Sequence, residues 1–489
     1  MSILLRHSAV YLLARSVPGV INFLAIAIYT RLLSPEEYGR YVLVFSVVTF
    51  INIVLYDWLR LSLLRFVSGQ SIDVISVKST VFTIFLTVNI LTLLVGIILY
   101  VVNNEQTWRM IVVVSVLLLW TQAWFDLHLQ SLRAGLQPLQ YGVVSWVRAF
   151  VSLGVGIVLV KYFHLSFFAP LVGFLVGNVC AGLINLQKEW SAVRIDMERR
   201  IACVLFSYGL PLVITQFFSF ALGLSDRFLI AAMIDEAAAG VYAATYDLVQ
   251  QVSTFLLSTF SLSAYPLLVR SHEQGPRANF RAQAKVNICA LLLLSAPIVI
   301  LLALYSTPVA SAYFGSDYRN TAATLIPWLA AAMLLSSVRS LHFDIAFQIS
   351  NRTTIITLIV GSAALANIVL NILLIPIWGL KGAAYSTLVS FLFALFLSVV
   401  AGQRVLPMPF PLLDVGKVVV GCAAMIGVFL IVDRLPFVSA IPLLVKAALV
   451  LLSYGSMMWA MDTAQMRSKA MTQLQHVKYM RSAKIGIGR

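Results

Sequence analysis

The sequence has little charge and no long polar segment. Charged residues make up 11% of its 489 residues, whereas hydrophobic residues make up 61%. The four cysteines are scattered without CxxC or Cys/His spacing, so we expect neither a disulfide framework nor a metal site. The longest polar stretches are Gln187–Phe206 and the tail after Met461, which leave no room for a separate soluble domain.

Recognisable catalytic motifs are also lacking. The chain has no GxSxG sequence, no Walker A sequence and no paired Cys/His residues. The longest loop expected on the outer side, about Thr307–Thr321, is too short to hold an active site for glycan synthesis. The net charge of +15 does not indicate a nucleic acid partner, because the basic residues do not gather with aromatic residues on one polar face. We therefore expect a protein that is not an enzyme and needs no cofactor.

What the sequence does contain is a series of fourteen long apolar blocks, with a mean hydropathy of +0.94 over the chain. A helix needs about 20 apolar residues to cross a bilayer. The blocks lack the alternation of half-exposed helices or strands, as expected of helices that face lipid. They predict an all-α polytopic membrane protein with about fourteen spans. The expected spans are Ser8–Thr30, Tyr41–Leu64, Ser79–Val102, Met110–Leu132, Tyr141–Tyr162, Phe167–Leu186, Ser207–Met233, Ala239–Val269, Ala284–Ser306, Ala322–Ile349, Thr353–Ile375, Leu380–Gln403, Val415–Val432 and Phe437–Met461.

The positive charges are distributed unequally between the two sides of the membrane. With both termini on one side, that side holds 21 of the 34 Lys and Arg residues and the other side holds 7. Cytoplasmic loops carry the excess of positive charge, so we expect both termini in the cytoplasm. The basic tail 462–489 has apolar residues on one helical face, which predicts an amphipathic helix on the inner leaflet, with a solvated tail as the alternative.

Two segments six spans apart resemble each other. Tyr29–Tyr41 and Ser225–Tyr242 each contain an arginine, a short acidic loop and then Gly-x-Tyr at the start of the next span. The preceding spans carry Pro18 and Pro211 near their starts. Six is an even number, so the copies share one orientation, which favours two parallel helix bundles around a cavity at mid-membrane.

Ionisable side chains inside the spans are the candidate functional residues, because each costs at least about 2.5–3.5 kcal/mol at the centre of a span. Arginine presents a planar fork that matches phosphate oxygens. The candidates for binding an anionic headgroup are Arg15, Arg60, Arg148, Arg227 and Arg339. The candidates for coupling transport to an ion are Asp57, Asp126, Asp247, Asp344 and His342.

Simpler interpretations exist for several of these residues. Asp57 and Arg60 are three residues apart and can neutralise each other. Arg227, near the expected outer end of its span, can reach the headgroups. Arg339 and Asp344 are five residues apart, which is a poor helical spacing for an ion pair. For each acid or histidine alone, a hydrogen bond between helices is a sufficient explanation.

One stretch carries a family resemblance. Ala364–Ser390 resembles the N-x-x-L-N-x-x-x-I-P-x-x-G-x-x-G-A-A motif of the oligosaccharidyl-lipid/polysaccharide flippase superfamily, which includes Wzx-type polysaccharide transporters, lipid II flippases and multidrug exporters. In this motif we expect Pro376 to end the eleventh span and Gly379 and Gly382 to form a tight turn. Arg31–Gly39, Leu132–Tyr141 and the start of the second half, from Tyr208, are also similar to the family.

The resemblance implies a fold of two six-helix bundles in a V around a cationic cavity, residues 1–190 and 206–403, followed by two additional spans in 414–461. It implies a flippase that moves an undecaprenyl-pyrophosphate-linked oligosaccharide from the inner to the outer leaflet of the bacterial cytoplasmic membrane. Arginines in such cavities are thought to hold the pyrophosphate. A polysaccharide polymerase and a chain-length regulator are the implied partners. The alternatives are a cation-coupled multidrug antiporter of the same fold and a non-transporting subunit of a polysaccharide synthase.

Overall fold

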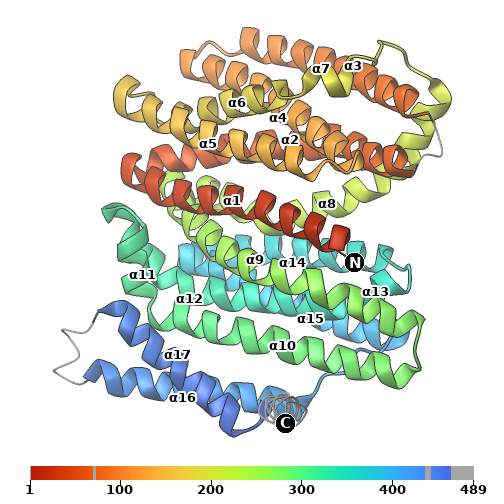
Figure 1. The fold of residues 1–489 in the computed structure, drawn as a ribbon. Coiled ribbons are helices and arrows are strands. Elements are labelled where there is room, and N and C mark those ends of the chain that lie inside the picture. The colour runs from red at the N-terminus through yellow and green to blue at the C-terminus, as the bar shows by residue number, and fades with distance from the viewer. Residues whose placement is uncertain (1, 70–72, 435–441, 464–489) are drawn as a thin grey trace, which may run out of the picture. The chain divides into compact units, whose positions relative to one another are not determined.

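The chain is described by a computed structural model that covers residues 2–69, 73–434 and 442–463 (Figure 1). Helices dominate these residues, and no strand occurs among them. Each of the fourteen expected spans overlaps a helix, and eleven helices within the described residues are long and apolar enough to cross a membrane. The prediction of an all-α polytopic membrane protein is therefore confirmed. The predicted tail helix lies outside the described residues.

The chain divides into two compact units, and the first comprises Met1–Gln251, Tyr313–Ala322 and Val360–Ser386. The helices that lie wholly in it are α1 (Ser2–Leu32), α2 (Pro35–Gly69), α3 (Val74–Val102), α4 (Gln106–Ala134), α5 (Pro138–Phe163), α6 (Phe168–Leu183), α7 (Leu186–Trp190) and α8 (Arg199–Met233). The N-terminal part of α9 (Glu236–Glu273) and most of α14 (Thr354–Trp378) also belong to it.

The second unit contains the rest of α9 and the remaining helices. These are α10 (Arg277–Leu304), most of α11 (Ser306–Tyr313) and of α12 (Ser316–Val338), the π-helical turn η1 (Arg339–Phe343), α13 (Ile345–Ile349), most of α15 (Leu380–Val405), α16 (Leu412–Arg434) and α17 (Leu443–Ala460). The segment 307–321, expected as an outer loop, is largely helical, because α11 and the start of α12 occupy it. The predicted division at residues 190, 206 and 403 stays a prediction.

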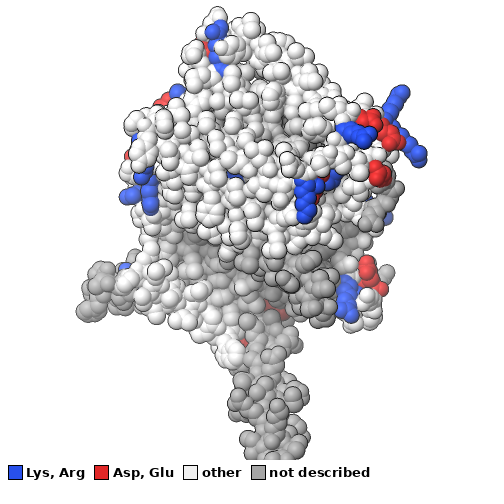
Figure 2. Space-filling model, turned by 45° about the horizontal axis from the view of Figure 1, so that its top comes forward, with Lys and Arg blue, Asp and Glu red and all other residues white. Residues whose placement is uncertain are grey.

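Much of the apolar surface faces outward. On α3, Leu94 is 53% exposed and Val102 is 72% exposed. The face drawn in Figure 2 is largely uncharged, and its charged side chains lie in a few small groups. A helix satisfies its own backbone hydrogen bonds, and such apolar helices are therefore suited to a lipid surround.

Small residues allow close helix packing in the first unit. A Cβ at Gly177 of α6 would lie 2.0 Å from Oγ of Ser152 in α5, and one at Gly173 would lie 2.5 Å from the carbonyl oxygen of the same serine. Only glycine permits this approach, which brings the backbones of α5 and α6 together.

Hydrogen bonds and an ion pair of Glu189 hold α7 against the rest of this unit. The carboxylate of Glu189 accepts hydrogen bonds from Lys78 Nζ at 3.0 Å, Ser131 Oγ at 2.9 Å and Gln137 Nε2 at 2.8 Å. The ammonium of Lys78 also lies 5.5 Å from the ring centre of Trp190. Burial raises the pKa of Glu189, but these hydrogen bonds and the charge of Lys78 outweigh burial and hold its pKa below the usual value.

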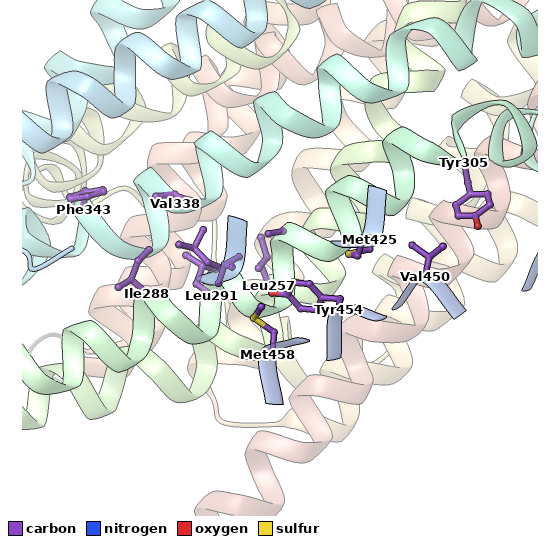
Figure 3. Packing of buried hydrophobic residues seen from close by; sticks show 13 residues of the cluster. Leu257, Ile288, Leu291, Tyr305, Val338, Phe343, Met425, Val450, Tyr454 and Met458 are labelled. Atoms are coloured by element: carbon purple, nitrogen blue, oxygen red, sulfur yellow. The ribbon is translucent and has the colours of Figure 1, made fainter. Parts of the chain in front are cut away.

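In the second unit, α16 and α17 share an apolar core with α9 and α10 (Figure 3). A Cβ at Gly421 of α16 would lie 2.3 Å from the terminal methyl of Met458 in α17, so the two helices are close. Tyr454 also donates a hydrogen bond to the carbonyl oxygen of Leu293 at 3.3 Å. The core residues drawn as labelled sticks are Leu257, Ile288, Leu291, Tyr305, Val338, Phe343, Met425, Val450, Tyr454 and Met458.

The expectation that Pro376 ends its helix was wrong. Helix α14 continues past Pro376 to Trp378 and ends at Gly379, which has a φ of 56°. A proline inside a helix removes one backbone donor and crowds the carbonyl of residue i−4, but α14 continues through Pro376 despite both effects. The left-handed conformation of Gly379, which glycine adopts without steric cost, sets the actual end.

Candidate functional site

The first unit contains a cavity of about 540 Å³. Residues of α1, α2, α4, α5, α6, α8 and α9 line it. Its charged lining residues are Arg148, Arg227 and Asp247. Tyrosine, phenylalanine, asparagine and glutamine side chains complete much of the wall: Tyr29, Tyr38, Tyr41, Tyr141, Phe45, Phe125, Phe174, Asn22, Gln250 and Gln251. Such a wall offers hydrogen bonds and aromatic faces together with an excess of positive charge.

Arg148 is held in this cavity by aromatic rings. Its guanidinium carbon lies 4.4 Å from the ring centre of Phe125 and 5.7 Å from that of Phe174. Among the described residues, Arg148 forms no hydrogen bond and no ion pair, although Asp126 interacts with it electrostatically. Cation–π contacts fix the plane of a guanidinium without using its N–H donors. The donors of Arg148 are therefore free for an anion in the cavity.

Arg227 is in a different state. Its Nη2 forms an ion pair with Oδ1 of Asp247, and the Arg227 side chain is only 7% exposed. The interpretation that Arg227 reaches the headgroups was wrong, since the residue is buried within the unit. Its neighbour Asp226 is completely buried and accepts hydrogen bonds from Tyr242 Oη at 2.7 Å and Asn371 Nδ2 at 2.6 Å.

The asparagines of the family-like motif join this network. Asn371 also donates a hydrogen bond to Asn367 Oδ1 at 3.1 Å, and Ser225 Oγ donates to the same oxygen at 3.1 Å. Both asparagines are fully buried. The motif therefore connects α14 to α8 beside the cavity residue Arg227.

Asp57, Arg60 and Asp126 form a charged group next to Arg148. Arg60 Nη2 lies 3.0 Å from Asp57 Oδ2, so the expected neutralisation along one face of α2 is present. Asp126 on α4 interacts electrostatically with Arg60 and with Arg148. Four of the candidate residues, from three different helices, are thus neighbours.

Arg339, His342 and Asp344 lie apart from this cavity, in the second unit. The poor spacing expected for Arg339 and Asp344 was wrong, because the π-helical turn η1 changes it. In this turn the N–H of Asp344 bonds to the carbonyl oxygen of Arg339 at 2.9 Å, and Arg339 Nε comes within 3.5 Å of Asp344 Oδ2. His342 Nε2 makes a hydrogen bond at 3.2 Å with the carbonyl oxygen of Pro409. π-turns inside helices are frequent at functional sites.

The structure therefore brings together six of the ten candidates, namely Asp57, Arg60, Asp126, Arg148, Arg227 and Asp247, and places Arg339, His342 and Asp344 elsewhere. The side chain of Arg15 lies outside the described part of the structure. Sequence reasoning missed Phe125 and Phe174, because aromatic residues are common in every span. No local signal marks the two that meet Arg148.

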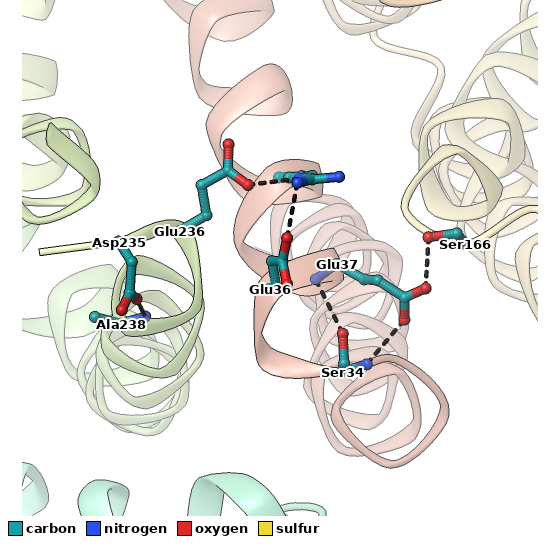
Figure 4. A network of polar contacts seen from close by, with 8 residues as sticks. Ser34, Glu36, Glu37, Ser166, Asp235, Glu236 and Ala238 are labelled. Carbon is teal, nitrogen blue, oxygen red and sulfur yellow. Dashed lines mark hydrogen bonds and ion pairs between the residues drawn. The ribbon is translucent and has the colours of Figure 1, made fainter. Parts of the chain in front are cut away.

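The two similar segments found in the sequence contact each other. A Cβ at Gly39 of α2 would lie 1.8 Å from the carbonyl oxygen of Glu236 in α9, and one at Gly240 would lie 2.8 Å from the backbone nitrogen of Gly39. Arg40 forms ion pairs with Glu36, at 2.7 Å, and with Glu236 (Figure 4). The two Gly-x-Tyr sequences are thus the point where the starts of α2 and α9 touch.

This contact region lies next to the cavity, because Tyr38 and Tyr41 line it. The start of α2 is capped reciprocally: the Ser34 N–H donates to Glu37 Oε2 at 2.9 Å, and the Glu37 N–H donates to Ser34 Oγ at 3.2 Å. Ser166, which precedes α6, donates to Glu37 Oε1 at 2.6 Å (Figure 4). Polar contacts between α2, α9 and the segment before α6 thus lie beside these two tyrosines.

Comparison with known proteins adds the following. The model of a family described as polysaccharide biosynthesis protein matches residues 4–272. An uncharacterized membrane protein of Methanocaldococcus jannaschii is 26% identical over 308 residues, which are 59% of this chain and 59% of that protein. The chain thus matches less than two thirds of the length of this relative.

Among solved structures, the lipid II flippase MurJ in an inward closed conformation is similar, with a TM-score of 0.74, 11% identity, and coverage of 92% of this chain and 98% of that chain. A multidrug resistance MATE family transporter in an inward-facing conformation gives a TM-score of 0.64 and 11% identity, with coverage of 81% and 97%. At these identities the similarity concerns the fold.

Proposed function

The chain belongs to the polysaccharide biosynthesis protein family, and from this premise we propose that it flips a polyprenyl-pyrophosphate-linked oligosaccharide from the inner to the outer leaflet of the bacterial cytoplasmic membrane. In this proposal it acts as a carrier and not as an enzyme. The oligosaccharide serves the assembly of O-antigen in lipopolysaccharide, of capsule or of exopolysaccharide. Both termini lie in the cytoplasm, in agreement with the positive charges on that side.

The observation that carries this proposal is the state of Arg148. It lies in a cavity, its plane is fixed by Phe125, and its N–H donors are unused within the described residues. A guanidinium in this state suits a pyrophosphate, because bidentate, charge-assisted hydrogen bonds are the strong ones. We assign the first contact with the pyrophosphate to Arg148, with Arg227 and Arg60 as nearby positive charges. The roles of Arg15 and Arg339 stay predictions.

The charges that line the cavity also favour one of the alternative functions over the others. A multidrug antiporter for cations would be served by an acidic cavity, whereas this lining contains two arginines and one aspartate. A subunit without transport activity has no need of a cavity that holds an unpaired arginine. We therefore favour the flippase and keep the polymerase and the chain-length regulator as proposed partners.

The test is a flipping assay with the full chain in liposomes. A fluorescent oligosaccharide on polyprenyl pyrophosphate is added, and a membrane-impermeant glycosidase reports the fraction on the outer face. Loss of a hydrogen bond to a charged group costs about 1.5–3 kcal/mol, so Arg148→Gln should lower the rate about 10- to 150-fold at subsaturating substrate. Arg148→Lys should retain part of it.

The matched control is Arg404→Gln, an exposed arginine in the last turn of α15. It removes the same charge outside the cavity, so the rate should stay at the wild-type value. Wild-type flipping by Arg148→Gln, or an equal loss in Arg404→Gln, would contradict the assignment.

A further inference from the structure

Asp126 differs from the other acidic candidates near the cavity, because no described side chain pairs with it directly. Asp57 is paired with Arg60 at 3.0 Å, and Asp247 is paired with Arg227. Asp126 forms no ion pair or hydrogen bond with the side chains that the structure describes, and it is only partly buried. It immediately follows Phe125, the residue on whose ring Arg148 lies. The interaction of this carboxylate with Arg148 is therefore charge attraction without a direct contact.

The charges around Asp126 come from a small number of helices. Helices α2, α3, α5 and α6 pack against α4. Helix α2 contributes Asp57 and Arg60, and α5 contributes Arg148. Helix α6 contains no Lys, Arg, Asp, Glu or His. Lys78 of α3 is paired with Glu189, and His128 of α4 itself accepts a hydrogen bond from the indole N–H of Trp190. The other charged residues of α2, α4 and α5 are not among the charges that act on Asp126: Glu36, Glu37, Arg40, Arg65, Arg109, Arg133 and Lys161.

The group formed by Asp57, Arg60, Asp126 and Arg148 is formally neutral when all four residues are ionised. A pyrophosphate on Arg148 adds at least two negative charges and takes over the guanidinium that balances Asp126. Arg60 cannot replace it, because Arg60 is already paired with Asp57. In a site of low dielectric, an excess of negative charge favours protonation of the carboxylate with the weakest compensation. Among the carboxylates described here, that is Asp126.

We propose that binding of a pyrophosphate group at Arg148 is coupled to the uptake of a proton by Asp126. This rests on the proposed function, since it assumes that Arg148 receives the anion. The proton comes from hydronium in the solvent: one O–H bond of hydronium breaks, one O–H bond forms on the Asp126 carboxylate, and water is released. When the anion leaves, the charge of Arg148 again balances that of Asp126, and Asp126 loses the proton. Protonation of Asp126 and occupation of Arg148 thus support each other.

The coupling has a thermodynamic signature. If binding takes up a proton, affinity must rise as the pH falls, by up to about tenfold per pH unit. The number of protons taken up follows from calorimetry of the purified full chain with farnesyl pyrophosphate in two buffers of different ionisation enthalpy. We expect wild type to take up close to one proton for each bound anion. Asp126→Asn should bind at least as tightly, with uptake near zero and little dependence on pH.

A control variant tests whether the proton uptake depends on Asp126 in particular. Asp196→Asn removes an exposed carboxylate in the loop before α8 and should leave the proton uptake unchanged. If Asp126→Asn does not fold, the pH dependence of wild-type binding and the uptake by Asp126→Glu, which should persist, test the same point.

The outcomes separate the two proposals. Binding by wild type without proton uptake, or undiminished uptake by a folded Asp126→Asn, would overturn the coupling and leave the flippase proposal standing. Absence of binding by wild type, or unaltered binding by Arg148→Gln, would overturn the proposed anion site itself.

Discussion

The contact between the starts of α2 and α9 leads to a prediction for Gly39→Ala. A new Cβ at residue 39 would lie 1.8 Å from the carbonyl oxygen of Glu236, whereas real Cβ contacts essentially never fall below 3.0 Å. The two backbones must therefore separate by about 1.2 Å, which is 3.0 minus 1.8 Å. Carbonyl oxygens of a helix cannot rotate away as a side chain can, so the helix itself has to move.

This separation should weaken the contact between α2 and α9. Overpacking costs about 1–3 kcal/mol, which corresponds to about a 5- to 150-fold lower population of the arrangement in which α2 and α9 touch. Arg40 and Glu236 are the natural reporters, because they pair across the contact. After the native cysteines are replaced, the double variant Arg40→Cys with Glu236→Cys should form a disulfide readily. Adding Gly39→Ala should slow the formation of this disulfide by about the same 5- to 150-fold. Flipping should fall as well.

The control is Gly154→Ala in α5. A Cβ at this position meets no atom within 4 Å, so cross-linking and flipping should stay at the parent level. The reasoning would be refuted if Gly39→Ala cross-linked and transported like Gly154→Ala, since the backbones would then not need the glycine.

Three further changes test the packing. Glu189→Gln should lower the free energy of unfolding by about 1.5–3 kcal/mol, measured by thermal unfolding in detergent. The pKa of Glu189 is lowered in the fold, so the stabilisation that its carboxylate provides is complete above about pH 4.5, the unfolded value, and is lost as the pH falls further. Gly421→Val should separate α16 from α17 at Met458, seen as early proteolysis of these helices. Asn371→Leu should destabilise the protein by leaving Asp226 short of a donor, and Asn371→Asp should not rescue it. Unchanged melting or proteolysis would contradict each.

The membrane spans could be predicted from the sequence because the bilayer imposes one strong requirement. Each span needs an uninterrupted apolar run, and such runs are visible without knowledge of the neighbours. Local details that depend on other forces were missed. The end of α14 is set by Gly379 and not by Pro376. The pairing of Arg339 with Asp344 depends on a π-turn, which a period of 3.6 residues does not reveal.

The sequence marked Arg148 as a candidate but did not indicate its surroundings. An arginine without an acid on its own helix, such as Arg148, needs a cavity or a partner from elsewhere, and the structure provides a cavity. The partners, Phe125 from α4 and Phe174 from α6, could not be foreseen, because a single sequence does not say which helices are neighbours. For the same reason Arg339 was grouped with Arg148 although they lie in different units.

The central claim is that the guanidinium of Arg148 receives the pyrophosphate of a polyprenyl-linked glycan. An experimental structure of the full chain with a bound polyprenyl-pyrophosphate oligosaccharide tests it most directly. We expect phosphate oxygens within hydrogen-bond distance of the Arg148 nitrogens, with Phe125 still beneath the guanidinium plane. Phosphates bound at Arg339, or a cavity that holds the lipid with Arg148 turned away from it, would contradict the account.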